Sequence, residues 1–225
     1  LGCGNIFTKL LSTRERQISY RAEFEKGEGN NVFLNDVTLY PNLAGVQTNL
    51  YKNFIERSWS LIADGAMVGF YHEYAVFDDA RGGNFREALY PRLRSAYQYQ
   101  NWLQLFSDVG AAKSFCMTLT STPQENIEFR FVANVFHPRV IAQCKARDSR
   151  LSVPALKDED GKWESRGHPD RLIKVTRTEL ELFAKLLDED DTPYTRARLP
   201  QVHSKQILQV LDRFAVSPKR LGDLK

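Results

Sequence analysis

The segment of residues 47–71 constrains the fold most, because it predicts a helix, a turn and a buried strand in direct succession. Gly65 suits the left-handed position that follows the end of a helix. Residues 66–71 are apolar on both faces, which is typical of a strand covered by helices on both sides of a sheet. The segment therefore predicts an α/β unit with this strand at the centre of the sheet. The apolar residues at helical spacing that this helix is expected to bury are Leu50, Tyr51, Phe54, Ile55, Leu61 and Ile62.

Length and composition fit a globular protein and exclude several other classes. The chain has 225 residues, of which 42% are hydrophobic and 26% are charged, enough for one domain or one and a half. No apolar run approaches the length that spans a membrane, and the first residues lack the features of a signal peptide. The cysteines are widely separated and the histidines are scattered, which argues against a zinc site or a disulfide framework. We therefore expect a cytoplasmic protein with no metal site and no membrane partner.

Periodicity and turn residues predict the remaining elements. Strands are expected at residues 97–106, 113–121, 127–131 and 172–175, and helices within 7–20 and at 84–90, 178–187 and 204–214. Glycine-rich or acidic stretches at 27–31 and 157–161 are predicted to be loops.

Aromatic, imidazole and carboxylate side chains gather where the first predicted strand ends. Tyr71, His72 and Glu73 close this strand, and a polar glycine loop follows at residues 78–84. Open α/β sheets bind ligands at the carboxyl ends of their strands. The spacing alone leaves open the alternative that Tyr71 belongs to the core and that His72 is a loop residue with ordinary hydrogen bonds.

Four arginines surround the helix expected after the glycine loop. They are Arg81, Arg86, Arg92 and Arg94. Guanidinium groups in such a cluster can contact the phosphates of a nucleic acid, and the net charge of +3 permits this without arguing for it. The alternative is a charged helix face that is simply solvated.

Three segments resemble one known family. They are Asn-Leu-Tyr-Lys-Asn-Phe-Ile-Glu-Arg at residues 49–57, the aromatic segment with its glycine loop at 69–83, and Phe-Arg-Glu-Ala-Leu-Tyr-Pro-Arg-Leu-Arg at 85–94. These are similar to segments of gamma-class DNA adenine methyltransferases of the type IIG restriction–modification and phage-defence kind, in which they follow a catalytic Asn-Pro-Pro-Tyr loop. Glu73 stands where proline is usual in that family. The resemblance covers most of the chain and is densest over residues 40–121.

The resemblance implies an α/β fold and an activity. Residues 1–122 would form the later half of a Rossmann-like methyltransferase sheet that ends in an antiparallel hairpin. Residues 123–225 would form a small α+β extension toward a target-recognition region. The implied reaction transfers a methyl group from S-adenosylmethionine to the exocyclic amine of adenine in double-stranded DNA.

The resemblance also implies the residues of the site. Phe106 matches the aromatic side chain that stacks on the flipped-out adenine, and such stacking offsets part of the cost of removing a base from the duplex. Ordinary core packing at a strand end is the alternative for Phe106. The other residues that it implies are Tyr71, His72 and Glu73 in the base pocket, Tyr51 and Phe54 on the cofactor side, and the four arginines at the DNA phosphates.

One departure from the family pattern bears on activity. No Asn-Pro-Pro-Tyr, Asn-Pro-Pro-Trp or Asp-Pro-Pro-Tyr tetrapeptide occurs in the sequence, so no catalytic residue is assigned. We expect a fragment whose partner is the missing N-terminal half of the methyltransferase. On its own it should be inactive and should bind S-adenosylmethionine weakly or not at all. The glycines within residues 1–5 are open to two interpretations, a cofactor-binding turn or a stretch that follows the catalytic loop.

Other functions stay open beside this one. A non-catalytic DNA-binding or assembly module of a restriction–modification system would need no catalytic group. A nuclease would use the acids at 158–160 with Lys157 and Lys162, although these residues lie in a predicted solvated turn. An unrelated hydrolase is disfavoured because no Gly-x-Ser-x-Gly motif occurs.

Overall fold

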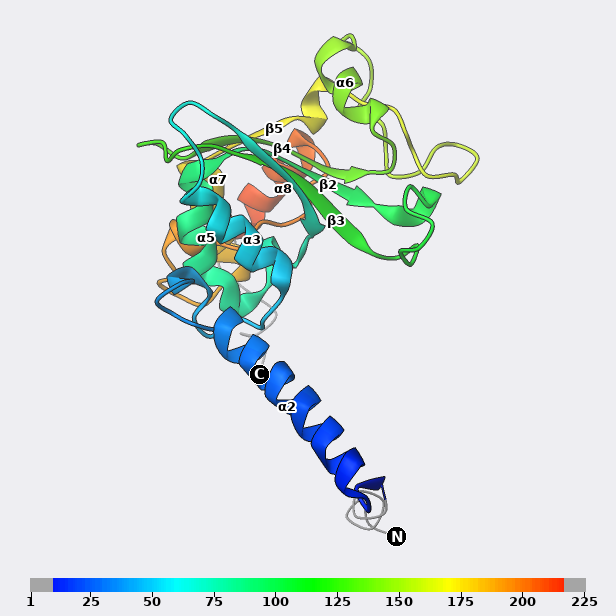
Figure 1. Ribbon diagram of the computed structural model, residues 1–225. Coiled ribbons are helices and arrows are strands. Elements are labelled where there is room, and N and C mark those ends of the chain that lie inside the picture. Colours follow the sequence, from blue (N-terminus) through cyan, green and yellow to red (C-terminus); the bar gives the residue numbers. More distant parts are fainter. Residues whose placement is uncertain (1–9, 217–225) are drawn as a thin grey trace, which may run out of the picture.

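The computed structural model describes residues 10–216 as a mixed α/β structure built on one five-stranded sheet (Figure 1). The strands are β1 (Val68–Glu73), β2 (Leu93–Gln100), β3 (Ser114–Thr120), β4 (Glu128–Val135) and β5 (Ile173–Thr176). Their order across the sheet is β1-β3-β2-β4-β5. β3 is antiparallel to both β1 and β2, β2 is parallel to β4, and β5 is antiparallel to β4.

Helices cover the two faces of the sheet unequally. α3 (Leu50–Trp59), α5 (Gly83–Leu89), α7 (Arg177–Leu187) and α8 (Lys205–Ala215) lie on one face, and α6 (Arg139–Ala146) lies on the other (Figure 1). The short α4 (Ala75–Asp78) follows β1. The 3-10 segments are η1 (Pro41–Leu43), η2 (Ala80–Gly82), η3 (Tyr90–Arg92), η4 (Asn101–Leu103), η5 (Pro169–Arg171) and η6 (Tyr194–Arg196).

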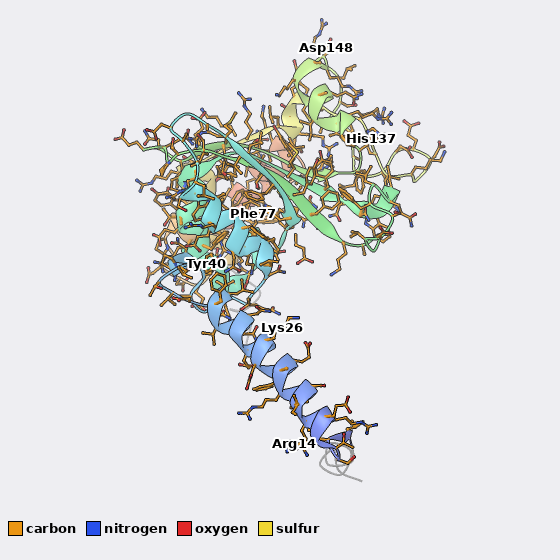
Figure 2. The ribbon with its side chains drawn as sticks, in the orientation of Figure 1. Arg14, Lys26, Tyr40, Phe77, His137 and Asp148 are labelled. Carbon is orange, nitrogen blue, oxygen red and sulfur yellow. The ribbon has the colours of Figure 1, made fainter. Side chains whose placement is uncertain are left out.

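α2 (Arg14–Leu34) extends away from the body of the molecule and buries no residue. Arg14 and Lys26 mark its course in Figure 2. The prediction of a loop at 27–31 is wrong, because both glycines of this stretch lie inside α2. Thr13 caps the amino end of the helix by accepting a hydrogen bond from the backbone of Arg16. None of the helices formed by residues 10–216 is long and apolar enough to cross a membrane.

The main core fills the space between the sheet and the four helices on its covered face. Phe77, labelled in Figure 2, is fully buried there. Strand residues such as Phe129 and Phe131 alternate with outward-facing ones, so they share the main core with Phe85 of α5 and Phe183 of α7. A smaller cluster lies on the opposite face, where β2 and β4 contact α6.

The predicted antiparallel hairpin and most strands are confirmed. β3 pairs antiparallel with β2, and β4 and β5 lie where alternation placed them. β2 begins earlier than expected and ends at Gln100 rather than at residue 106. The helix after residue 204 is confirmed, and the one expected near 178 begins at Arg177 with a capping box between Thr176 and Glu179. α6 was not predicted. The sheet also continues past residue 122, because β4 and β5 join the first three strands.

Two predictions about the opening segment are wrong. β1 is an edge strand with alternating exposure rather than a central strand buried on both faces. The helix face is also different, since α3 ends before Leu61 and exposes Leu50 and Phe54. Its buried face is polar instead, and it consists of Lys52, Asn53, Glu56 and Ser58 around Ile55.

Candidate functional site

An aromatic cleft opens at the carboxyl end of β1, on the sheet face opposite the main helix layer. Its volume is about 450 Å³, and its walls come from β1, from the loop between β2 and β3, and from the start of β3. Side chains alternate along a strand, so Tyr71 of β1, Tyr99 of β2 and Phe115 of β3 share this face. Phe106 reaches the cleft from the loop that follows η4. Three neighbouring strands and one loop therefore position the site.

The rings form a connected cluster in which Phe106 remains partly exposed. Tyr99 and Phe115 are stacked with centroids 5.2 Å apart. Phe106 stands edge-on to Phe115 at 4.9 Å and edge-on to Tyr71 at 6.2 Å, both within the usual range for aromatic pairs. The exposed fractions are 44% for Phe106 and 58% for Tyr71. A planar apolar group that entered the cleft could therefore cover ring surface that now faces water.

The rim of the aromatic cleft is charged. Glu73, Asp108 and Lys113 border the rings. Burial, followed by the nearby Tyr71 hydroxyl, raises the pKa of Tyr99, so this phenol is neutral at pH 7. The cleft thus combines an apolar floor with a polar edge, which suits a flat ligand that carries hydrogen-bonding groups on its periphery.

The imidazole of His72 does not face this cleft, although His72 borders it. The ring lies on the helix-covered face, stacked on Tyr51 with centroids 5.5 Å apart. Its Nε2 lies 3.1 Å from the Thr118 hydroxyl and its Nδ1 lies 2.8 Å from the Glu73 carbonyl oxygen. Burial lowers the pKa of His72 to about 4, so the imidazole is neutral at pH 7. The expectation that its side chain lines the base pocket is therefore corrected, because successive strand residues point to opposite faces.

A second, polar cleft lies on the other side of the carboxyl end of β1. Its volume is about 470 Å³, and Tyr51, Lys52, Glu73 and Asp79 are among its walls. Within the described chain the Tyr51 hydroxyl has no hydrogen-bond partner, and burial followed by the Glu73 carboxylate raises its pKa. The buried ammonium of Lys52 pairs with Asp79 at 3.3 Å. Glu73 borders both clefts.

The two cofactor-side candidates lie in different surroundings. Tyr51 lines the polar cleft, whereas Phe54 is 58% exposed and borders neither cleft. Of the two, only Tyr51 is placed where it could contact a ligand at the end of β1.

The arginines expected at phosphate do not form one surface patch. Arg86 is 1% exposed and donates to the carbonyl oxygens of Asp79 and Arg196 at 2.6 and 2.9 Å. Arg92 lies over the Trp59 ring at 4.8 Å, and Arg94 donates to the Thr122 carbonyl oxygen at 2.6 Å. Arg81 is the exposed member of the four. The phosphate role is therefore corrected for Arg86, whose guanidinium is occupied by backbone carbonyl groups.

The other sequence motifs add no site to the described chain. No group of three or more histidine, cysteine, aspartate or glutamate side chains within residues 10–216 could hold a metal ion. The acids at 158–160 form a turn in which Asp158 accepts hydrogen bonds from the backbone of Asp160 and Lys162. Residues 1–5, with the two interpretations of their glycines, lie outside the described residues.

The sequence did not indicate three of the residues that form the aromatic cleft or hold its loop in place. Tyr99 and Phe115 pack behind Phe106, and Asn101 holds its loop. Tyr97 and Tyr99 are two residues apart, and so are Phe115 and Met117. Residues at this spacing lie on the same face of a strand, so the sequence did indicate a second apolar face of the sheet. Asn101 has no such signal, because a polar residue after a strand usually indicates only a turn.

The polar residues that line the aromatic cleft are Tyr71, Glu73, Asp108, Lys113 and Ser114, whereas the neutral His72 imidazole is turned away from it. No protein-family model matches the chain, and no curated protein matches it.

Proposed function

We propose that this chain supplies the adenine-binding part of an S-adenosylmethionine-dependent DNA adenine methyltransferase of a restriction–modification or phage-defence system. The observation that carries the proposal is the partly exposed Phe106 ring at the aromatic cleft beside the end of β1. An enzyme that modifies the amine of adenine has to take the base out of the stack. Stacking on an aromatic side chain contributes roughly 1–3 kcal/mol per base. A cleft of about 450 Å³ lies within the size range of ligand pockets.

The topology of the sheet supports an N-terminal partner segment. No strand within residues 10–216 pairs with the outer edge of β1, and both clefts lie at the carboxyl end of this strand. An open strand edge presents unpaired backbone groups to another strand. We propose that the missing half of the methyltransferase continues the sheet there and brings the Asn-Pro-Pro-aromatic loop, which this sequence lacks. In this arrangement the strands of the missing half and the strands of this chain would together form the Rossmann-like sheet.

The arginines favour this proposal over an independent DNA-binding module. Such a module would depend on a basic surface for most of its affinity. Arg86, Arg92 and Arg94 instead bind backbone carbonyl groups of their own chain. Double-stranded DNA would then be held mainly by the flipped base and by the partner half, with Arg81 as the exposed cation near the polar cleft.

The isolated chain is expected to bind S-adenosylmethionine weakly or not at all. Of the two cofactor-side candidates, Tyr51 lines the polar cleft and Phe54 does not, and we place most cofactor contacts on the missing half. Titration calorimetry of the 225-residue chain should show no micromolar binding. A micromolar dissociation constant would instead favour a cofactor-binding turn within residues 1–5.

The base-stacking role of Phe106 can be tested with single-stranded DNA that carries one 2-aminopurine, a fluorescent isomer of adenine. A single strand presents its bases already unpaired, so no target sequence is needed. Binding to the chain should quench the 2-aminopurine, and Phe106→Ala should weaken this binding by roughly 5- to 150-fold, which corresponds to 1–3 kcal/mol. Phe106→Trp should keep most of the affinity, because any aromatic face can stack.

Phe54→Ala is the matched control, since Phe54 is a more exposed phenylalanine outside both clefts. It should bind the probe as the wild type does. Thermal melting of each variant distinguishes the alternative of core packing, for which Phe106→Ala should cost about 3–5 kcal/mol of stability. If Phe106→Ala quenched the 2-aminopurine fluorescence as strongly as the wild-type chain does, the proposed site would be refuted.

A further inference from the structure

Asn101 is a buried amide directly beneath the loop that carries Phe106. It is the first residue of η4, after β2, and its side chain is fully buried. Its Nδ2 donates to the carbonyl oxygens of Phe106 at 2.9 Å and of Val109 at 2.7 Å. Its Oδ1 accepts from the Phe106 backbone N–H at 3.1 Å. The amide thus binds both backbone polar groups of Phe106 and uses both of its donors.

The backbone of Asn101 closes the same loop. Its N–H donates to the Lys113 carbonyl oxygen at 3.1 Å, and its carbonyl oxygen accepts from the Gln104 N–H at 2.7 Å. Gln104 has a φ of 49°, a left-handed conformation that a residue other than glycine adopts only when its surroundings hold it. The path of the loop from residue 101 to residue 113 is therefore set around Asn101.

Side-chain packing alone would hold Phe106 only loosely. Its ring is 44% exposed and meets Phe115 and Tyr71 edge-on. A ring that has to be ordered when a ligand binds contributes less affinity than one already held in place. We infer that Asn101 is a positioning residue, which fixes the backbone of Phe106 so that its ring is ready to stack on a planar base. This inference rests on the proposed function of Phe106.

The test compares two single-atom changes at equally buried amides. Asn101→Asp removes both donors to the Phe106 loop and keeps the volume of the side chain. Gln98→Glu is the matched control, because Gln98 is also fully buried and its Nε2 donates to the Tyr99 carbonyl oxygen and the Ser114 hydroxyl, not to the Phe106 loop. Asn101→Ala, which is neutral, replaces Asn101→Asp if the buried carboxylate prevents folding.

Two measurements are made on the 225-residue chain. Hydrogen exchange of the amides at 104–110 should be at least about fivefold faster in the Asn101 variants than in the wild type, and unchanged in Gln98→Glu, since a buried hydrogen bond left unmade costs about 1–3 kcal/mol, or roughly 5- to 150-fold. The quenching of the 2-aminopurine oligonucleotide should fall in the Asn101 variants toward the level of Phe106→Ala, and it should be retained in Gln98→Glu.

The outcomes distinguish this inference from the proposed function. Unchanged exchange of the loop in the Asn101 variants would overturn the positioning role. Faster exchange with wild-type quenching would overturn it as well, because Phe106 would then stack without a fixed backbone. Wild-type quenching by Phe106→Ala would remove the proposed function, and the positioning role would fall with it.

Discussion

Gly167→Ala is expected to destabilise the protein by about 3 kcal/mol, the upper end of the usual cost of overpacking. A methyl group at this position would overlap the Val140 carbonyl oxygen and would lie 2.7 Å from the Cys144 backbone nitrogen. Both atoms belong to the backbone of α6, so the clash cannot be relieved by turning a side chain. The helix would have to move away from the sheet, where Val140 and Cys144 are buried. Thermal melting should show a fall of roughly 6–12 °C for a chain of this size.

Gly29→Ala is the appropriate control for this substitution. Gly29 lies inside α2, and nothing lies within 4 Å of the position that its methyl group would take. Alanine is favoured over glycine in a helix by about 0.5–1 kcal/mol, so no loss of stability is expected. A wild-type melting temperature for Gly167→Ala would mean that the segment around residue 167 does not pack tightly against α6.

Local periodicity predicted β4 because its first residues follow the simplest rule. Glu128 and Arg130 are exposed, and Phe129 and Phe131, which alternate with them, are buried in the main core. The position of β1 in the sheet could not be predicted in the same way. An apolar run of six residues is compatible with a central strand or with an edge strand, and the choice depends on which strands are present to pair with it.

The face of α3 shows where binary patterning fails. Asn53 and Glu56 are buried on this helix, and each has a specific partner for one of its side-chain polar atoms, so burial costs less than the pattern assumes, although Asn53 Oδ1 and Glu56 Oε2 have no partner within the described residues. Asn53 donates to the Leu34 carbonyl oxygen at 2.8 Å, and Glu56 accepts from both the backbone and the side chain of Asn42. Such partners come from segments far along the chain, and no local pattern identifies them. Phe54 was expected to be buried, but it lies on the opposite side of the helix and is exposed.

The candidate site could be predicted only in part. The resemblance placed Phe106 and Tyr71 in one pocket, and in the structure both line the aromatic cleft with their ring centroids 6.2 Å apart. A resemblance matches residue types position by position and carries no information on which face of a strand a side chain occupies. It therefore did not indicate that the His72 side chain lies on the helix-covered face of the sheet. The supporting residues, Asn101 above all, act through backbone contacts whose geometry only the folded loop reveals.

Arg86→Met is expected to cost about 3 kcal/mol of stability, the sum of the penalties for the three carbonyl groups that it would leave without a donor. The Arg86 guanidinium donates to the carbonyl oxygens of Asp79, Arg196 and Val76, the last at 3.5 Å. Removing a buried charge recovers some desolvation energy, and methionine fills much of the volume. We expect that gain to be the smaller effect, because three carbonyl oxygens lose their donor at once. Urea denaturation followed by fluorescence measures the difference.

The same variant distinguishes a structural role of Arg86 from a DNA-phosphate role. Arg81→Met is the matched control, since it removes the same charge from an exposed neighbour and should change stability by less than about 0.5 kcal/mol. If Arg86 is structural, Arg86→Met should melt at a lower temperature and, well below that temperature, still quench the 2-aminopurine probe with a wild-type salt dependence. If Arg86 contacts phosphate, the melting temperature should stay and the slope of affinity against salt should fall by about one. The burial of its guanidinium and its hydrogen bonds to backbone carbonyl oxygens favour the first outcome.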